Sequence, residues 1–334
     1  MATLSAIHPT LLDFAKRMDP NGNIDKIVEI LVQTNPILED MVFVEANEVT
    51  GHRTTIRTGL PTPTWRKLYG GVQPAKSTTV QVTDSIGMLE TYAEVDKALA
   101  DLNGNSAAWR MSEERAFIEG MNQEMASTLI YGNEATAPEE FTGLFSRFDS
   151  SSAANGENII SGGGVSGGDG TSIWLVCWGE NTVHGLFPKG SQAGLKMTDK
   201  GQVTIESIDG AGGRMEAYRT HYRWDFGLSV RDWRYVVRIG GIDTSALVKD
   251  AATGPDLTDL MAQAIELLPS VSMGRPVFYA NRTVRSYLRR QIENKTKNST
   301  LTMDQVGGKR VMAFDDIPVK RCDAILNTES SVGS

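Results

Sequence analysis

Histidine and cysteine, the side chains that most often carry catalytic or metal-binding chemistry near neutral pH, are few and scattered in this sequence. The chain has 334 residues, with four histidines and two cysteines. None of the histidines has a cysteine or carboxylate at metal-ligand spacing; they are His8, His52, His184 and His221. Cys177 lies inside an apolar stretch, where a thiol is more typical of a core than of a nucleophile. We therefore expect no catalytic residues, no metal site and no cofactor.

Two other motifs suggest an acid and base pair and a phosphate-binding loop, but their residues lack the geometry that these sites need. Adjacent carboxylates diverge on a helix and point to opposite faces of a strand, so they do not form an acid and base pair. The adjacent pairs are Glu113 and Glu114, Glu139 and Glu140, and Asp315 and Asp316. Residues 162–170 are rich in glycine but lack the Gly-Lys-Ser/Thr ending of a phosphate-binding loop. We interpret them as a flexible connector. A β-rich hydrolase with an unrecognised site stays an alternative.

Composition narrows the class of protein further. The chain carries 33 Lys and Arg against 41 Asp and Glu, a formal net charge of −8. This acidity argues against electrostatic wrapping of nucleic acid. Two isolated cysteines indicate a reducing compartment without a disulfide framework. The sequence has neither a transmembrane run nor the basic and apolar regions of a signal peptide, so we expect no membrane partner.

A long helix predicted over residues 106–131 is the element around which the chain is organised. Its apolar residues recur at four-residue steps, which predicts one buried stripe. That stripe consists of Phe117, Met121, Met125 and Leu129. Asn105 or Ser106 can cap its start and Gly132 its end. At 1.5 Å per residue the helix would be about 39 Å long, so something extended must lie along it.

Residues 47–91 predict a long β-hairpin. Two alternating β-branched runs, residues 51–58 and 77–83, flank a tip rich in proline and glycine at residues 59–71. A lone two-stranded ribbon is marginal in water, so its tip should contact another surface. The residues predicted to make this contact with a neighbouring copy are Trp65, Arg66, Lys67, Leu68 and Tyr69. The alternative is a hairpin folded back on its own domain.

The N-terminal residues predict an extended arm that also reaches a neighbour. A short helix is predicted over residues 24–33, ended by Asn35 and Pro36, with a short strand at residues 41–44. The arm residues predicted to contact the neighbour are Ile27, Ile30, Leu31, Ile37 and Leu38.

The second half of the chain predicts strands and then helices. Apolar strands are expected at residues 172–178 and 182–187, and long antiparallel strands with one wet face at residues 200–208, 214–226 and 228–239, broken at Gly227.

A helix–strand–helix unit then follows over residues 257–292. Strands at residues 311–319 and 324–327 are expected to close the domain. Arms, ribbons and a rod-like helix without catalytic residues are typical of a protein whose partner is itself, because neighbouring copies then cover their apolar faces.

The order of these parts resembles that of the major capsid protein of tailed bacteriophages. The parts are an arm, a hairpin, a short helix ending Ala-Asp-Leu102, a long helix ending Tyr-Gly-Asn133 and then Phe-x-Gly-Leu144. Residues 30–40 are similar to the arm of capsid proteins from short-tailed phages. The resemblance implies an α+β capsid fold with an N-terminal arm, an extended β-hairpin loop, a peripheral domain with a spine helix and long antiparallel strands, and an axial α/β domain.

One departure from the family suggests a permuted chain order. The long strands of residues 200–239 precede the helix–strand–helix unit, so we expect strands 214–239 to pack beside the spine helix. The expected parts are residues 1–46 (arm), 47–91 (extended loop), 92–150 (peripheral domain with spine helix 106–131), 151–171 (Gly/Ser-rich linker), 172–199 (axial strands), 200–240 (long peripheral strands), 241–328 (axial domain) and 329–334 (disordered tail).

The resemblance also implies a function. Such proteins form hexamers and pentamers that close into an icosahedral capsid around double-stranded DNA, which they contact non-specifically. It implies a portal, a scaffold and a cement protein as partners, assembly in the bacterial cytoplasm and a final place in the virion. Some members crosslink a hairpin lysine to a neighbour's asparagine; Lys67 and Lys76 lie near the tip, but no matching asparagine or glutamate is identified, so no crosslink is expected. An encapsulin-like shell, carrying enzymes instead of DNA, is the alternative.

Overall fold

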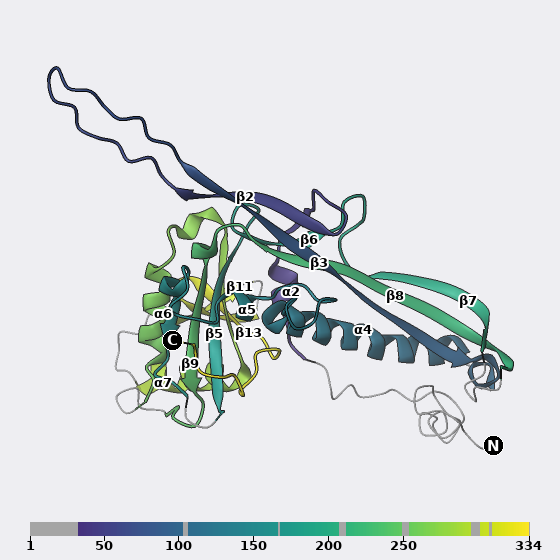
Figure 1. Ribbon diagram of the computed structural model, residues 1–334. Coiled ribbons are helices and arrows are strands. Elements are labelled where there is room, and N and C mark those ends of the chain that lie inside the picture. Colours follow the sequence, from purple (N-terminus) through teal and green to yellow (C-terminus); the bar gives the residue numbers. More distant parts are fainter. Residues whose placement is uncertain are drawn as a thin grey trace. The chain divides into compact units, whose positions relative to one another are not determined.

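The protein is described by a computed structural model that covers residues 33–102, 106–165, 168–206, 212–248, 254–294, 301–306 and 309–333 (Figure 1). Its helices are α2 (Ile37–Asp40), α3 (Lys97–Ala100), α4 (Ser106–Tyr131), α5 (Leu144–Arg147), α6 (Leu257–Glu266) and α7 (Arg282–Asn294). Its strands are β1 (Phe43–Glu45), β2 (Gly51–Gly59), β3 (Thr78–Asp96), β4 (Ile159–Ser161), β5 (Gly170–Trp178), β6 (Val183–Phe187), β7 (Lys196–Glu206), β8 (Arg214–Val230), β9 (Val236–Asp243), β10 (Arg275–Ala280), β11 (Leu301–Val306), β12 (Lys309–Phe314) and β13 (Ile317–Arg321). No described helix is long and apolar enough to cross a membrane.

The chain forms two compact units. Among the described residues, the smaller unit contains 33–34, 88–126 and 194–225, and the larger unit contains 35–87, 127–193 and 226–333. Three continuous elements, β3, α4 and β8, contribute residues to both units.

The larger unit is built on a mixed sheet with β5 near its centre. Strand β5 pairs antiparallel with β10 on one side and with β9 on the other, and β13 continues the sheet beyond β10. Every residue of β5 is buried. A strand that is covered on both faces needs a continuous apolar run, and residues 172–178 supply one.

Helices α6 and α7 cover one face of this sheet. Met261 and Ala264 of α6, with Val284 and Leu288 of α7, belong to one buried cluster with side chains of β5, β9 and β10. Asp256 caps α6, because its carboxylate accepts hydrogen bonds from the backbone N–H groups of residues 258 and 259. The predicted helix–strand–helix unit is therefore confirmed as α6, β10 and α7.

The smaller unit packs one part of the long helix against a β-ribbon. Strand β7 pairs antiparallel with β8, from Lys196 opposite Arg223 to Glu206 opposite Arg214. Met121 of α4 joins a cluster with Tyr222 and Ala93, and the Phe117 ring stacks on the Tyr222 ring with 6.1 Å between centroids. The expectation that residues 214–239 lie beside the spine helix is thus confirmed for β8 up to residue 225.

The same expectation is wrong for β9, which pairs with β5 in the larger unit. The chain turns at a 3₁₀ helix over Trp233–Tyr235, where the Asp232 carboxylate accepts a hydrogen bond from the backbone N–H of Arg234. Every residue of β9 is buried, so this strand suits a sheet interior rather than a ribbon with one wet face.

Two further expectations for strands differ from the structure. Gly227 does not break the strand, because β8 continues through it to Val230. A Cβ at this glycine would lie 2.6 Å from the carbonyl oxygen of Ser85, so the glycine permits close approach of β3. Residues 324–327 form no strand.

The expected linker and tail are both partly ordered. Within residues 151–171, β4 pairs in parallel with β9, and Gly170 already begins β5. The backbone N–H of Glu329 donates to the carbonyl oxygen of Gly170 at 2.8 Å, and that of Gly333 donates to Asp149 at 3.0 Å. Residues 329–333 are therefore held by backbone hydrogen bonds to distant residues. The polar sequence of this terminus gives no sign of these bonds.

Candidate assembly surface

The loop between β2 and β3 presents large side chains to solvent. Figure 1 shows this loop extending beyond the paired strands. Trp65, Leu68 and Tyr69 expose 103%, 83% and 97% of their reference surface, and Arg66 and Lys67 are exposed beside them. The five predicted tip residues therefore lie together at one exposed turn. The alternative in which the hairpin folds back on its own domain is wrong for this conformation.

The tip has a defined local turn. The backbone N–H of Gly70 donates to the carbonyl oxygen of Lys67 at 3.0 Å, and Tyr69 adopts a left-handed backbone with φ of 64°. A bulky residue rarely takes this conformation. The turn sets Leu68 and Tyr69 beside the two cations, which gives the tip an apolar and a positive character together.

The base of the hairpin is anchored by a buried carboxylate. Asp84 of β3 accepts a hydrogen bond from the Ser229 hydroxyl at 2.8 Å and forms an ion pair with Arg147 at 2.9 Å. Asp84 and Ser229 are both buried. These contacts tie the base of the hairpin to Ser229 and Arg147, and the loss of either partner would leave a buried charge less well compensated.

Two histidines lie beside this base. The rings of His52 and His184 meet edge to face, with 6.1 Å between centroids. His184 is buried, and neither of its ring nitrogens has a hydrogen-bond partner among the described residues. Burial, with His52 and Arg231 nearby, lowers the pKa of His184 to about 4. The imidazole is therefore neutral near pH 7, and its protonation in the folded chain is unfavourable.

A groove in the smaller unit runs along the long helix. Its lining includes Leu89 of β3 and Phe117 and Met121 of α4, with Glu113 and Glu124 at its edge, and its volume is about 430 Å³. The groove thus combines an apolar floor with acidic groups. Of the predicted helix stripe, Met121, Met125 and Leu129 are buried and Phe117 is half-buried.

The arm residues are placed differently from the prediction. Ile37 and Leu38 expose 1% and 9%, so they lie inside their own chain and are not available to a neighbour in this conformation. The segment is fixed by Asp40, which accepts a hydrogen bond from the Tyr279 hydroxyl at 2.8 Å and pairs with Lys320. Ile27, Ile30 and Leu31 lie outside the described residues.

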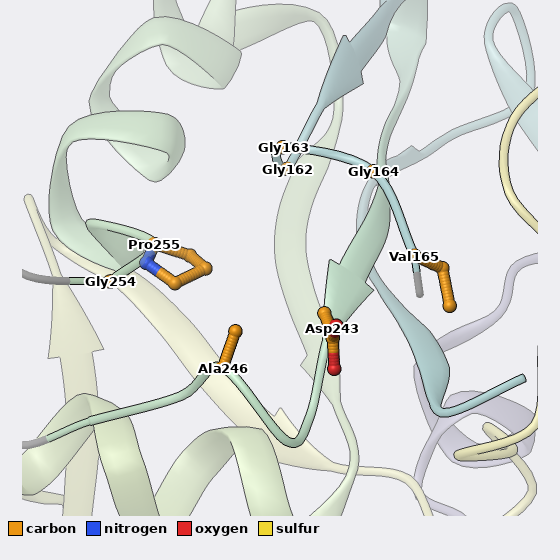
Figure 2. Close-up of a pocket in the computed structure, with 8 residues that line it drawn as sticks. All are labelled: Gly162, Gly163, Gly164, Val165, Asp243, Ala246, Gly254 and Pro255. Atoms are coloured by element: carbon orange, nitrogen blue, oxygen red, sulfur yellow. The ribbon is translucent and has the colours of Figure 1, made fainter. Parts of the chain in front are cut away.

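The glycine-rich run borders a shallow pocket that has the wrong charge for phosphate. Figure 2 shows Gly162, Gly163 and Gly164 on one side of it and Pro255 on the other. Asp243 is the charged side chain among the eight lining residues, and its carboxylate accepts hydrogen bonds from the backbone and hydroxyl of Ser245. The lining therefore supplies a negative charge where phosphate recognition needs donors.

The sequence gives no local signal for one buried ion pair. The Arg238 guanidinium lies 3.3 Å from the Glu329 carboxylate, and both side chains are about 1% exposed. The Tyr131 and Ser172 hydroxyls donate to the same carboxylate at 2.5 and 2.8 Å. Arg238 and Glu329 are 91 residues apart, so no local pattern could pair them.

A match over nearly the whole chain decides the family. Residues 19–333 match the model of a family described as major capsid protein GP7. The chain belongs to the major capsid protein GP7 family. This capsid protein is also similar to a chain in the near-atomic structure of bacteriophage Epsilon15, with 41% identity, a TM-score of 0.73 and coverage of 100% of both chains.

Two more distant structures resemble the capsid protein over part of its length. The bacteriophage JBD30 capsid matches at 10% identity and a TM-score of 0.49, covering 89% of this chain and 93% of that one. The holo-SrpI encapsulin complex from Synechococcus elongatus PCC 7942 matches at 14% identity and a TM-score of 0.46, covering 70% and 97%. No curated protein matched the chain.

The family match confirms the resemblance to the major capsid proteins of tailed phages, including the short-tailed type, and with it the α+β capsid fold. The chain is a structural protein of a capsid shell. The family match therefore favours a phage capsid protein over the encapsulin-like alternative.

Proposed function

We propose that this capsid protein assembles into hexamers and pentamers that close into an icosahedral shell around double-stranded DNA, without catalytic activity of its own. The exposed hairpin tip carries the proposal. Trp65, Leu68 and Tyr69 place a large apolar area in water, which is unfavourable by about 25 cal/mol for each Å². A neighbouring copy that covers these side chains removes that cost, and repetition of the contact builds a ring.

The tip and the α4 groove have matching chemistry for such a contact. The tip offers two aromatic rings, Leu68 and two cations, and the groove offers an apolar floor with the exposed Glu124. Aromatic and arginine side chains are the usual anchors of interfaces. We propose that the tip of one copy lies on the groove of another.

The acidic charge of the chain is compatible with DNA as the content of the shell. The net charge of −8 disfavours tight wrapping of the polyanion, so packaged DNA contacts the inner wall non-specifically and can slide along it. An encapsulin-like shell would hold a protein cargo instead. The ratio of absorbance at 260 and 280 nm of purified shells distinguishes nucleic acid from protein content.

The proposal also covers the partner proteins of the shell and the compartment in which it assembles. A portal at one vertex, a scaffold during assembly and a cement protein on the outside are the partners it includes. Assembly takes place in the cytoplasm of the bacterial host, and the finished shell belongs to the virion.

A triple substitution at the tip tests self-assembly through the hairpin. Trp65→Ala, Leu68→Ala and Tyr69→Ala together remove the apolar anchors from an exposed loop, so the fold should be preserved. We expect the variant to stay as small oligomers in size exclusion and negative-stain microscopy, where the unmodified protein forms closed shells. Met197→Ala, which removes an apolar side chain 56% exposed on β7, is the matched control and should still assemble. Closed shells from the triple variant would contradict a role for the tip.

A further inference from the structure

Helix α7 carries four arginines, for which the described side chains supply one carboxylate within ion-pair range. Val284 and Leu288 turn inward to the core, and the outward positions carry arginine. Arg282, Arg289 and Arg290 are exposed, and Arg285 is half-buried. Among the described side chains, Asp323 is the carboxylate within ion-pair range of these arginines, 3.9 Å from Arg282. Like charges three and four positions apart on a helix repel one another, so a negative partner stabilises this face.

The arginines also repel one another. Burial, with the nearby charges of Arg289 and Arg321, lowers the pKa of Arg285. The Nε atom of Arg285 is buried without a hydrogen-bond partner among the described residues. Beside it, the Arg290 guanidinium lies over the Tyr287 ring, 5.0 Å from its centroid. The face therefore combines positive charge with the partly buried ring of Tyr287.

A groove of opposite character lies along the neighbouring helix α6. Its lining is apolar at Ile159, Ile160, Ile265 and Leu267, and its volume is about 690 Å³. Ile160 and Ile265 pack against the main core, so the floor of the groove is fixed.

The acidic side chains of the groove stand at its edge. Glu157, Glu266 and Asp315 belong to the lining and are exposed. Asp315 and Asp316 form the turn between β12 and β13 with positive φ of 50° and 63°, which fixes the direction of both residues. No described cation lies within ion-pair distance of these carboxylates. The groove is thus an apolar slot with a negative edge.

We propose that the α7 arginine face of one copy docks into the α6 groove of the next copy and closes each ring of the shell. This inference rests on the proposed function and deepens it by naming the contact. The contact is heterologous when each copy gives its α7 helix to one neighbour and its α6 groove to the other, and it then repeats around a ring. Arginine stems cover the apolar slot, and the guanidinium groups reach the carboxylates.

The pairing of the two surfaces favours a second copy over nucleic acid. An arginine face alone would suit phosphate, but phosphate would leave the acidic slot unpartnered. A copy of the same chain satisfies both surfaces with one contact, and opposite charges across an interface also steer association.

Charge reversal tests the pairing from each side. Variant A carries Arg289→Glu and Arg290→Glu, and variant B carries Glu157→Lys and Glu266→Lys; Asp315 is spared because its positive φ makes substitution ambiguous. We expect a loss of closed shells of at least tenfold for each variant alone, measured by size exclusion and negative-stain microscopy. Arg289→Lys with Arg290→Lys keeps the charge and should keep assembly, and circular dichroism checks the fold of every variant.

Mixing the variants distinguishes this contact from a general effect of charge. In a mixed ring each groove of A faces a helix of B and each groove of B faces a helix of A, so every contact is again complementary. Rings of six should return when A and B are co-expressed. A ring of five cannot alternate, so it retains a mismatched contact and closed shells stay scarce. Combining all four substitutions in one chain should restore both rings.

Each outcome bears on the inference. Normal shells from variant A or B alone, or failure of both the mixture and the combined variant, would overturn the pairing while wild-type shells uphold the proposed function. Intact shells from variant A with altered DNA content would assign the arginines to nucleic acid and also overturn it. Absence of shells from the wild-type protein would overturn the proposed function and this contact together.

Discussion

At the scale of single residues, the buried pair of Arg238 and Glu329 holds the C-terminal segment in place. The guanidinium donates to the carbonyl oxygen of Phe148 at 2.6 Å and lies over the Phe145 ring, 4.0 Å from its centroid. Desolvation raises the pKa of Glu329 and lowers that of Arg238, and their hydrogen bonds and opposite charges offset this cost. Such a pair contributes little net stability, but the loss of one partner strands a buried charge.

Glu329→Ala is therefore expected to lower the free energy of unfolding of the unassembled protein by about 3–5 kcal/mol. Chemical denaturation followed by circular dichroism measures it. Glu48→Ala breaks the exposed pair with Arg53 and should cost no more than about 1 kcal/mol. Equal effects of the two substitutions would contradict the role given to the buried pair.

His184 predicts how stability changes with pH. Its pKa of about 4 in the folded chain lies below the usual 6.5, so the unfolded chain binds more protons between these values. Stability should then be fully present above about pH 6.5 and fall as the pH drops toward 4, by on the order of 3 kcal/mol from this residue. His184→Phe removes the titrating group, and its unfolding free energy measured from pH 7 to pH 4.5 should decline less steeply than that of the wild type. If the unfolding free energies of the variant and the wild type declined in parallel with pH, His184 would not be the cause of the pH dependence.

At the scale of elements, the long helix is held to the β-ribbon of the smaller unit by a small cluster. Met121 is buried with Tyr222 and Ala93, and few other buried side chains share that cluster. Met121→Ala should cost about 2–5 kcal/mol, because a buried methionine leaves a cavity. Met111→Ala on the same helix removes a side chain 59% exposed and should cost no more than about 0.5 kcal/mol. Thermal unfolding of the two variants makes the comparison, and a similar loss for both would contradict the assigned core.

At the scale of the whole molecule, the shell is expected to be held without covalent bonds between copies. Burial raises the pKa of Cys177 to about 11 and that of Cys322 to about 12, so neither thiol is available as a thiolate. Lys67 is exposed at the tip, but no asparagine partner is identified for it. Boiled shells should run as a single band of 36.4 kDa in denaturing gels, with or without reductant. A ladder of higher masses would show a crosslink.

The sequence alone determined the elements whose signals are local. The helix predicted over residues 106–131 has these bounds in the structure, because four-residue periodicity and a stop at Gly132 act within a few turns. The hairpin follows from alternation and from proline and glycine in the same way, whereas only the structure decided that its tip is exposed and not folded back on its own domain. The family resemblance rests on the order of these local signals.

Tertiary structure decided which distant segments meet. The pairing of β9 with β5, the burial of Ile37 and Leu38, the close approach at Gly227 and the pair of Arg238 with Glu329 all join residues far apart in the chain. Periodicity tells which face of an element is apolar but not which element covers it. That choice depends on the packing of the whole core, which no local window contains.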